Sequence, residues 1–173
     1  MKKNNSNIEK LRKNYSDYPQ EIKKYISPID LSDEDYVKEW LSTPFIHKSI
    51  PEEMPVYLTD NGEHVRSKSE LNIANMLYKM NVPYKYECPL TFSNGKVIYP
   101  DFTLLDIRNR CEVYWEHRGM MDDRNYLKHT VQRVKDYRKE GIHIGDNLLI
   151  TEETSVLPLG TDEILSVIQH FLK

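Results

Sequence analysis

The chain has 173 residues, a net charge of −3 and an apolar fraction of 39%, which suits one domain with an appendage. Proteins that coat nucleic acid without selectivity are usually strongly basic, so this charge disfavours that class. Cys88 and Cys111 form no CxxC or Cys/His cluster, which argues against a structural zinc site. Both fall in predicted strands, so we expect two buried thiols.

No apolar stretch is long enough to cross a bilayer, and the polar N-terminus lacks the apolar core of a signal peptide. We therefore expect a cytoplasmic protein with no membrane partner. Residues 1–55 are rich in Lys, Asn, Ser and Asp and form a predicted helical arm. One short helix is expected over residues 8–15. A second begins after Ser32, where acids fill the first turn, and has Trp40 and Leu41 on an apolar stripe.

The arm has two interpretations. It either packs Trp40 and Leu41 on the folded core or binds a partner, which includes a second copy of the chain in a homodimer. Residues 56–173 form the predicted folded domain. Its helices are expected over residues 71–80, 122–139 and 161–172, and its strands over residues 84–92, 96–105, 111–117 and 146–151.

Periodicity and turn signals support this order of elements. An Asn94-Gly95 pair predicts a hairpin between the first two strands, and Leu127, Val131 and Val134 mark the predicted apolar side of the second helix. The last strand follows a helical crossover, so it is expected to pair in parallel with a core strand. The domain is therefore predicted to be an α/β fold with a mixed sheet flanked by helices.

Two acids stand inside apolar, aromatic strands. Asp101 follows Tyr99-Pro100, and Glu116 follows Tyr114-Trp115. Hairpin pairing brings residues on adjacent strands to within about 5 Å, where two carboxylates repel each other and one pKa rises. Mg²⁺ relieves this repulsion and binds a few carboxylate oxygens while it keeps several waters. The alternative is that Asp101 simply ends a strand and Glu116 is a solvated residue unrelated to it in space.

This arrangement resembles the PD-(D/E)XK nuclease superfamily, whose restriction-endonuclease-like core has the order αβββαβ. Pro100-Asp101 looks like the first half of the motif, and Glu116-His117-Arg118 looks like the second half, (D/E)XK. The resemblance covers roughly residues 65–151. It implies a nuclease that binds Mg²⁺ or Mn²⁺ through Asp101 and Glu116, with the backbone carbonyl of His117 as a further ligand.

Glu70 matches a helix Glu that completes the acidic site in many members, so the resemblance implies a catalytic and metal-binding role. The competing interpretation is a capping box, in which Ser67 and Glu70 satisfy the start of the helix. Arg118 stands where the family has lysine. It is the predicted transition-state stabiliser, although arginine cannot act as a base. Some members supply the lysine from another element, and Lys68, Lys85 and Lys128 are candidates here.

Basic and polar side chains on the two core helices are predicted to hold the nucleic-acid backbone; these are Arg66, Lys68, Lys128, Gln132 and Lys135. The alternative is a solvated helix face. Gln132 and Tyr137 are similar to a Gln and Tyr on this helix in the exonuclease-like branch, at a spacing one residue longer. The predicted function is hydrolysis of phosphodiester bonds, with DNA as the expected substrate. Its rival is an inactive nuclease-fold module that binds nucleic acid or a protein.

Overall fold

The computed structural model describes residues 17–19, 31–48, 53 and 55–172. The chain divides into two compact units, Met1–Thr43 and Pro44–Lys173, whereas the predicted boundary lay after residue 55. In the first unit, helix α3 (Asp33–Ser42) begins after Ser32, whose hydroxyl accepts a hydrogen bond from the Asp35 amide at 3.1 Å. This start matches the prediction. The predicted helix at residues 8–15 lies outside the described residues.

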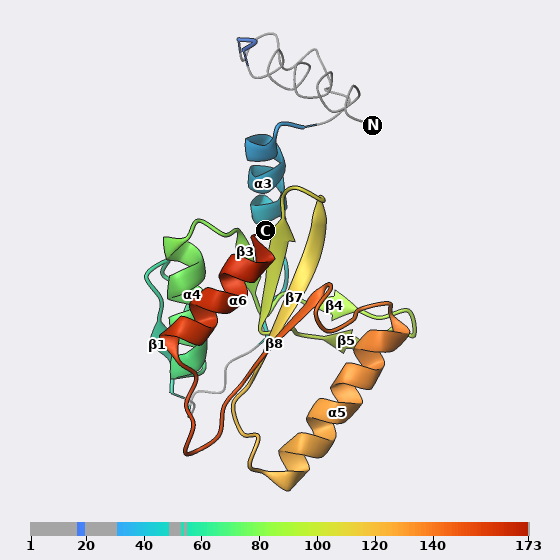
Figure 1. The fold of residues 1–173 in the computed structure, drawn as a ribbon. Coiled ribbons are helices and arrows are strands. Elements are labelled where there is room, and N and C mark those ends of the chain that lie inside the picture. Colours follow the sequence, from blue (N-terminus) through green and yellow to red (C-terminus); the bar gives the residue numbers. More distant parts are fainter. Residues whose placement is uncertain (1–16, 20–30, 49–52, 54, 173) are drawn as a thin grey trace. The chain divides into compact units, whose positions relative to one another are not determined.

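The second unit contains a mixed sheet and three helices (Figure 1). In order along the chain, its elements are β1 (Tyr57–Leu58), β2 (His64–Val65), α4 (Lys68–Lys79), β3 (Tyr84–Tyr86), β4 (Leu90–Thr91), β5 (Val97–Ile98), β6 (Phe102–Asp106), β7 (Cys111–Arg118), α5 (Arg124–Lys139), β8 (Leu148–Glu152) and α6 (Thr161–Phe171).

The central sheet has the strand order β3-β6-β7-β8. Strands β3, β6 and β7 pair antiparallel, and β8 pairs in parallel with β7 after the α5 crossover. The predicted α/β class and the parallel pairing of the last strand are therefore confirmed. Helices α4 and α6 lie together on one face of the sheet, and α5 lies on the other (Figure 1).

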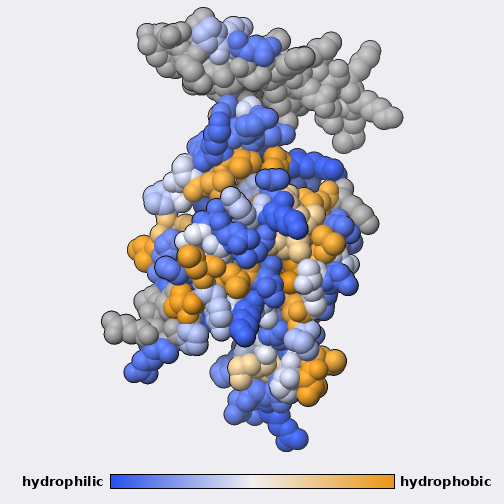
Figure 2. Space-filling view, turned by 90° about the vertical axis from the view of Figure 1, so that its left-hand side faces the viewer, coloured by the Kyte–Doolittle hydropathy of each residue, from blue (hydrophilic) through white to orange (hydrophobic). Residues whose placement is uncertain are grey.

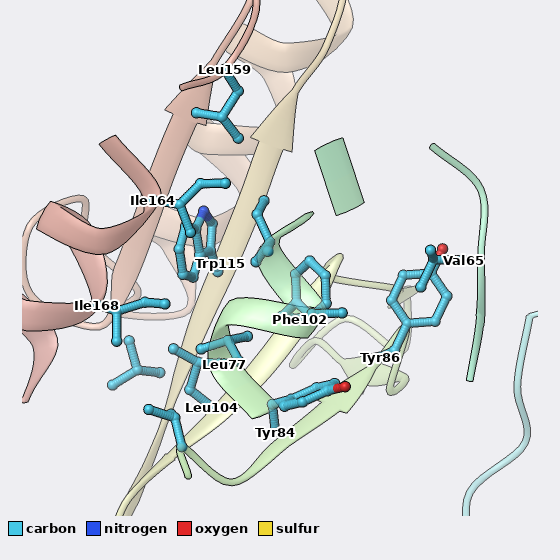
Figure 3. Packing of buried hydrophobic residues seen from close by; sticks show 14 residues of the cluster. Val65, Leu77, Tyr84, Tyr86, Phe102, Leu104, Trp115, Leu159, Ile164 and Ile168 are labelled. Carbon is cyan, nitrogen blue, oxygen red and sulfur yellow. The ribbon is translucent and has the colours of Figure 1, made fainter. Parts of the chain in front are cut away.

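A large apolar core fills the space between the sheet and helices α4 and α6. Figure 3 shows Trp115 and Phe102 of the sheet beside Leu77 of α4 and Ile164 and Ile168 of α6. All five side chains are inaccessible to solvent. The outer surface of this helical layer mixes hydrophilic and apolar side chains (Figure 2). A smaller cluster on the other face includes Tyr114 of β7, Tyr137 of α5 and Leu148 of β8.

Two predicted strands are wrong in their extent. Residues 84–92 and 96–105 each break in the middle, and β4 and β5 form a separate two-stranded ribbon. Pro89 and Pro100 lie at the two breaks, where proline has no amide hydrogen to donate to a sheet. The ribbon turns at Gly95, with a φ of 80°. The prediction of two buried thiols is also wrong, because Cys88 is only half-buried and Cys111 is exposed.

Candidate functional site

The register of β6 and β7 brings the two motif acids together. Phe102 pairs with Trp115, and both rings point into the main core (Figure 3). The next positions along the same register are Asp101 and Glu116, which lie on the opposite face because strand side chains alternate. The His117 amide donates a hydrogen bond of 2.6 Å to Asp101 Oδ2. Asp101 thus binds the β7 backbone through its side chain at the point where β6 begins.

The carboxyl of Asp101 lies in an environment that opposes its charge. Burial raises its pKa well above the ordinary value, and the negative charges of Glu116 and Glu70 raise it further. The His117 amide and the charge of Arg133 act in the other direction but do not cancel the rise. A divalent cation is the kind of ligand that would relieve this repulsion, since its positive charge would favour the ionised form of Asp101 beside the neighbouring acids.

Helix α5 supplies the groups that hold Glu116. Arg133 Nε donates to Glu116 Oε1 at 2.8 Å, and Arg133 Nη2 lies 2.6 Å from the same oxygen. The Tyr137 hydroxyl donates to Oε1 as well, and Arg133 Nη2 also donates to the backbone carbonyl of Tyr99. Arg133 and Tyr137 are four residues apart and therefore project from one face of the helix. Burial still raises the pKa of Glu116, although Arg133 and Tyr137 oppose this.

Glu70 fulfils the capping interpretation, and its charge also reaches the acidic site. Its Oε2 accepts hydrogen bonds from the amides of Arg66 and Ser67 at 2.8 and 3.2 Å, and Ser67 Oγ accepts from the Glu70 amide. The Tyr86 hydroxyl adds a bond of 2.8 Å to the same Oε2. Because Glu70 also raises the pKa of Asp101, the cap and a role in the acidic site are compatible.

Each of these three carboxylates has one oxygen engaged by protein donors and one that is not. Among the described residues, no hydrogen bond reaches Asp101 Oδ1, Glu116 Oε2 or Glu70 Oε1. None of the three is among the buried atoms that lack a partner, so solvent reaches them. In the described part of the chain, no three His, Cys, Asp or Glu side chains form a group that could hold a metal ion. A cation here would therefore rely on two carboxylates and water.

The other motif residues have partners away from the carboxylates. Arg118 Nη1 donates to Glu152 Oε1 at 2.8 Å across the β7–β8 pairing. The His117 ring is buried, with Nδ1 3.1 Å from Thr151 Oγ1 and Nε2 3.2 Å from Glu153 Oε1. The second contact is close but does not have hydrogen-bond geometry. The ring thus lies between two residues of the β8 end, on the face opposite Glu116.

The predicted nucleic-acid contacts are scattered. Arg66 makes a two-pronged ion pair with buried Glu87, with Nε–Oε1 and Nη2–Oε2 distances of 2.9 and 2.8 Å. Lys68 at the start of α4 is exposed, as are three residues of α5, which are Lys128, Gln132 and Lys135. Lys85, a predicted source of the missing lysine, is buried with Nζ 5.6 Å from the centre of the Phe45 ring.

On α5, Arg133 rather than Gln132 joins Tyr137 at Glu116. Gln132 is exposed and bonds Asp136 at 2.9 Å, whereas Arg133 shares the Glu116 oxygen with Tyr137. The four-residue spacing of Arg133 and Tyr137 was the available signal, because it places both on one side of a helix. The nominal apolar side was misleading, since Val131 is 54% exposed.

No protein-family model matches the chain. A segment of 113 residues is 34% identical to the uncharacterized protein MJ1519 of Methanocaldococcus jannaschii, over 62% of this chain and 9% of that protein. Among solved structures, a chain of the DrdV–DNA complex superposes with a TM-score of 0.37 and 14% identity, over 63% of this chain and 12% of the other. The chain thus spans only about a tenth of the proteins that it matches. Among the described residues, no helix is long and apolar enough to span a membrane.

Proposed function

We propose that this protein is a divalent-metal-dependent nuclease that hydrolyses phosphodiester bonds. The observation that supports this best is the pair of half-buried acids Asp101 and Glu116, each with one oxygen fixed by the protein and one left for another ligand. Fixed carboxylates of this kind are unfavourable without a cation. Carboxylate oxygens are the ligands that Mg²⁺ and Mn²⁺ prefer, so the donor set fits a hard divalent ion.

In this proposal Asp101 and Glu116 hold Mg²⁺ or Mn²⁺, with Glu70 assisting and the carbonyl of His117 as a further candidate ligand. When bound, the ion supplies a reactive hydroxide from water and neutralises charge on the phosphate. The His117 amide holds Asp101 in place. Arg133 and Tyr137 do the same for Glu116. Such fixed groups need little rearrangement when the reaction occurs.

The reaction balances as a hydrolysis. The attacking water gives up a proton to solvent as its oxygen forms a bond to phosphorus. The bond from phosphorus to the leaving oxygen breaks, and the leaving oxygen takes up a proton from solvent. A positive side chain near the phosphate would stabilise the charge that develops. DNA is the substrate that the motif resemblance implies. The proposed contacts to its backbone are Arg66, Lys68, Lys128, Gln132 and Lys135.

Cleavage assays on single- and double-stranded DNA and RNA, with Mg²⁺ or Mn²⁺ and with EDTA, test the proposal. We expect metal-dependent cleavage by the wild type and only background cleavage by Asp101→Asn, which keeps an acceptor for the His117 amide. Asp106→Asn is the matched control, because Asp106 lies at the other end of β6 and accepts from the Asn109 amide at 3.0 Å. Equal cleavage by wild type and Asp101→Asn would contradict the proposal.

One observation favours the rival, an inactive module of the same fold that binds nucleic acid or a protein. Arg133 already neutralises Glu116, and a permanently neutralised carboxylate has less need of a metal. Calorimetric titration with Mn²⁺ separates the two functions. The nuclease proposal expects Mn²⁺ binding that Asp101→Asn abolishes. A wild type that binds DNA but no Mn²⁺ would support the module instead.

A further inference from the structure

We propose that Arg133, on helix α5, is the positive side chain that acts on the phosphate at this site, in place of the lysine that the motif lacks. This inference rests on the proposed nuclease function and names one of its catalytic residues. It also moves the role from Arg118, where the motif alone puts it, to a residue 15 positions later in the sequence that reaches the site from a different element.

The Arg133 guanidinium lies directly beside the proposed metal site. Arg133 Nε and Nη2 lie 2.8 and 2.6 Å from Glu116 Oε1, so the guanidinium directly adjoins a proposed metal ligand. The second hydrogen bond of Nη2, to the Tyr99 carbonyl, ties the same group to the residue two positions before Asp101. The guanidinium therefore bridges the two strand segments that supply the acids.

One edge of the Arg133 guanidinium remains available to a ligand. Among the described residues, Nη1 of Arg133 makes no hydrogen bond, and the side chain is 36% exposed. The bonded edge fixes the group, and the Nη1 edge can donate to a phosphate oxygen. Arginine suits this task because its planar fork binds two oxygen partners at once and stays charged throughout. Arg133 then donates hydrogen bonds and neither gives nor takes a proton.

Arg133 and Arg118 differ in the acids that balance their charges. The Arg118 side chain is 14% exposed and pairs with Glu152, which lies beyond the acidic site on β8. Its charge is thereby balanced by an acid that has no part in the proposed metal set. Among the described residues, Arg133 forms its ion pair with Glu116, and its charge also acts on Asp101. If Glu116 shares its charge with a metal ion, the positive charge of Arg133 becomes available to a phosphate.

The test uses the full chain and three variants, which are Arg133→Met, Arg133→Lys and Arg118→Met. We expect Arg133→Met to lower kcat by about 100-fold, with KM changed by no more than a few-fold. Arg133→Lys keeps a charge and should recover about tenfold of that loss. Arg118→Met should lose less than Arg133→Met. Arg138→Met is the matched control on the same helix, because Arg138 is exposed, and its kcat should stay within about twofold of wild type.

Mn²⁺ affinity separates this role from a structural one. Removing a cation from beside Glu116 reduces competition for that carboxylate, so Arg133→Met should bind Mn²⁺ as tightly as wild type or more tightly. A residue that only positions Glu116 would give weaker Mn²⁺ binding and a loss of kcat in proportion. That result, or a larger loss in Arg118→Met than in Arg133→Met, would overturn the inference.

The wild-type control separates this inference from the proposed function. If the wild type cleaves and Asp101→Asn does not, full activity in Arg133→Met refutes the role of Arg133 alone. If the wild type cleaves nothing in Mg²⁺ or Mn²⁺, the nuclease function fails and this role fails with it.

Discussion

The two faces of the central sheet are built differently. Helices α4 and α6 pack on one face through fully buried aliphatic side chains, including Ile73, Leu77, Ile164 and Ile168. On the other face, Tyr137 is the one residue of α5 that is buried, and its hydroxyl bonds Glu116. The first face is held by a large apolar core, and the second combines a smaller apolar cluster with polar contacts around an acid.

This difference indicates that one face of the sheet stabilises the fold and the other holds the candidate site. Apolar burial is the main source of folding free energy, so the α4–α6 face fixes the sheet. The α5 face can then hold buried acids that reduce stability but favour a ligand. Proteins commonly keep such unfavourable groups at functional sites. Substitutions on the two faces should therefore have different effects on the free energy of unfolding.

Ile168→Ala on α6 should lower the free energy of unfolding by about 2–5 kcal/mol, because it leaves a cavity in a fully buried site. Val131→Ala on α5 is the matched control. Val131 is 54% exposed, so its truncation should cost no more than about 0.5 kcal/mol. Urea unfolding followed by circular dichroism measures both. Similar losses in the two variants would remove the proposed contrast between the faces.

Tyr137→Phe should lower the free energy of unfolding by about 1–3 kcal/mol, because Glu116 loses a buried donor to a charged group. The ring stays in place and keeps its contact with Phe92, at a centroid distance of 5.8 Å. Tyr126→Phe on the same helix is the comparison, since the Tyr126 hydroxyl oxygen accepts a hydrogen bond from the Gly119 backbone amide and no bond from this hydroxyl to an acid is formed among the described residues. An equal or larger loss in Tyr126→Phe would show that Glu116 is not the important partner.

Asp101→Asn should stabilise the metal-free protein at neutral pH. The pKa of Asp101 is raised in the folded state, so the folded protein binds this proton more tightly than the unfolded chain. Wild-type stability is then lost as pH rises from the ordinary aspartate pKa through the raised one. The variant does not lose this stability. The loss in the wild type is about 1.4 kcal/mol for each unit by which folding raises the pKa of Asp101. Thermal unfolding in EDTA should show a gap between variant and wild type that widens with pH.

Asp122→Asn should have the opposite effect from Asp101→Asn and destabilise the protein at neutral pH. Hydrogen bonds from Ser155 lower the pKa of Asp122. The charged form of Asp122 therefore stabilises the folded protein above the ordinary aspartate pKa, and this stabilisation is lost as pH falls.

Adding Mg²⁺ should stabilise the wild type more than Asp101→Asn, because only the wild type keeps the proposed ligand. A pH-independent gap for Asp101→Asn would contradict the interpretation of its environment.

The sequence was sufficient to predict how Asp101 and Glu116 meet. Hairpin pairing and two-residue alternation are local rules, and both apply near this pair. The four-residue spacing places Arg133 and Tyr137 on one side of a helix, but it does not show that this side faces Glu116, because the rotation of a helix on a sheet depends on tertiary packing. Helix α5 has few buried apolar residues, so its periodicity did not reveal that its polar side faces Glu116. The breaks at Pro89 and Pro100 were predictable from the missing amide hydrogen.

Two arginine–glutamate pairs test how burial on the α5 face affects the strength of an ion pair, and the expected energies are the smallest of those considered. Arg118–Glu152 and Arg133–Glu116 have similar nitrogen–oxygen distances, but Glu152 is 49% exposed and Glu116 only 12%. A double-mutant cycle on Arg118 and Glu152 should give a coupling of about 0.2–1 kcal/mol, which weakens in 1 M salt. The Arg133–Glu116 cycle should give a larger coupling that salt reduces less, since solvent screens a buried pair poorly. Equal coupling energies would mean that the lower exposure of Glu116 does not strengthen its pairing with Arg133 relative to the more exposed Arg118–Glu152 pair.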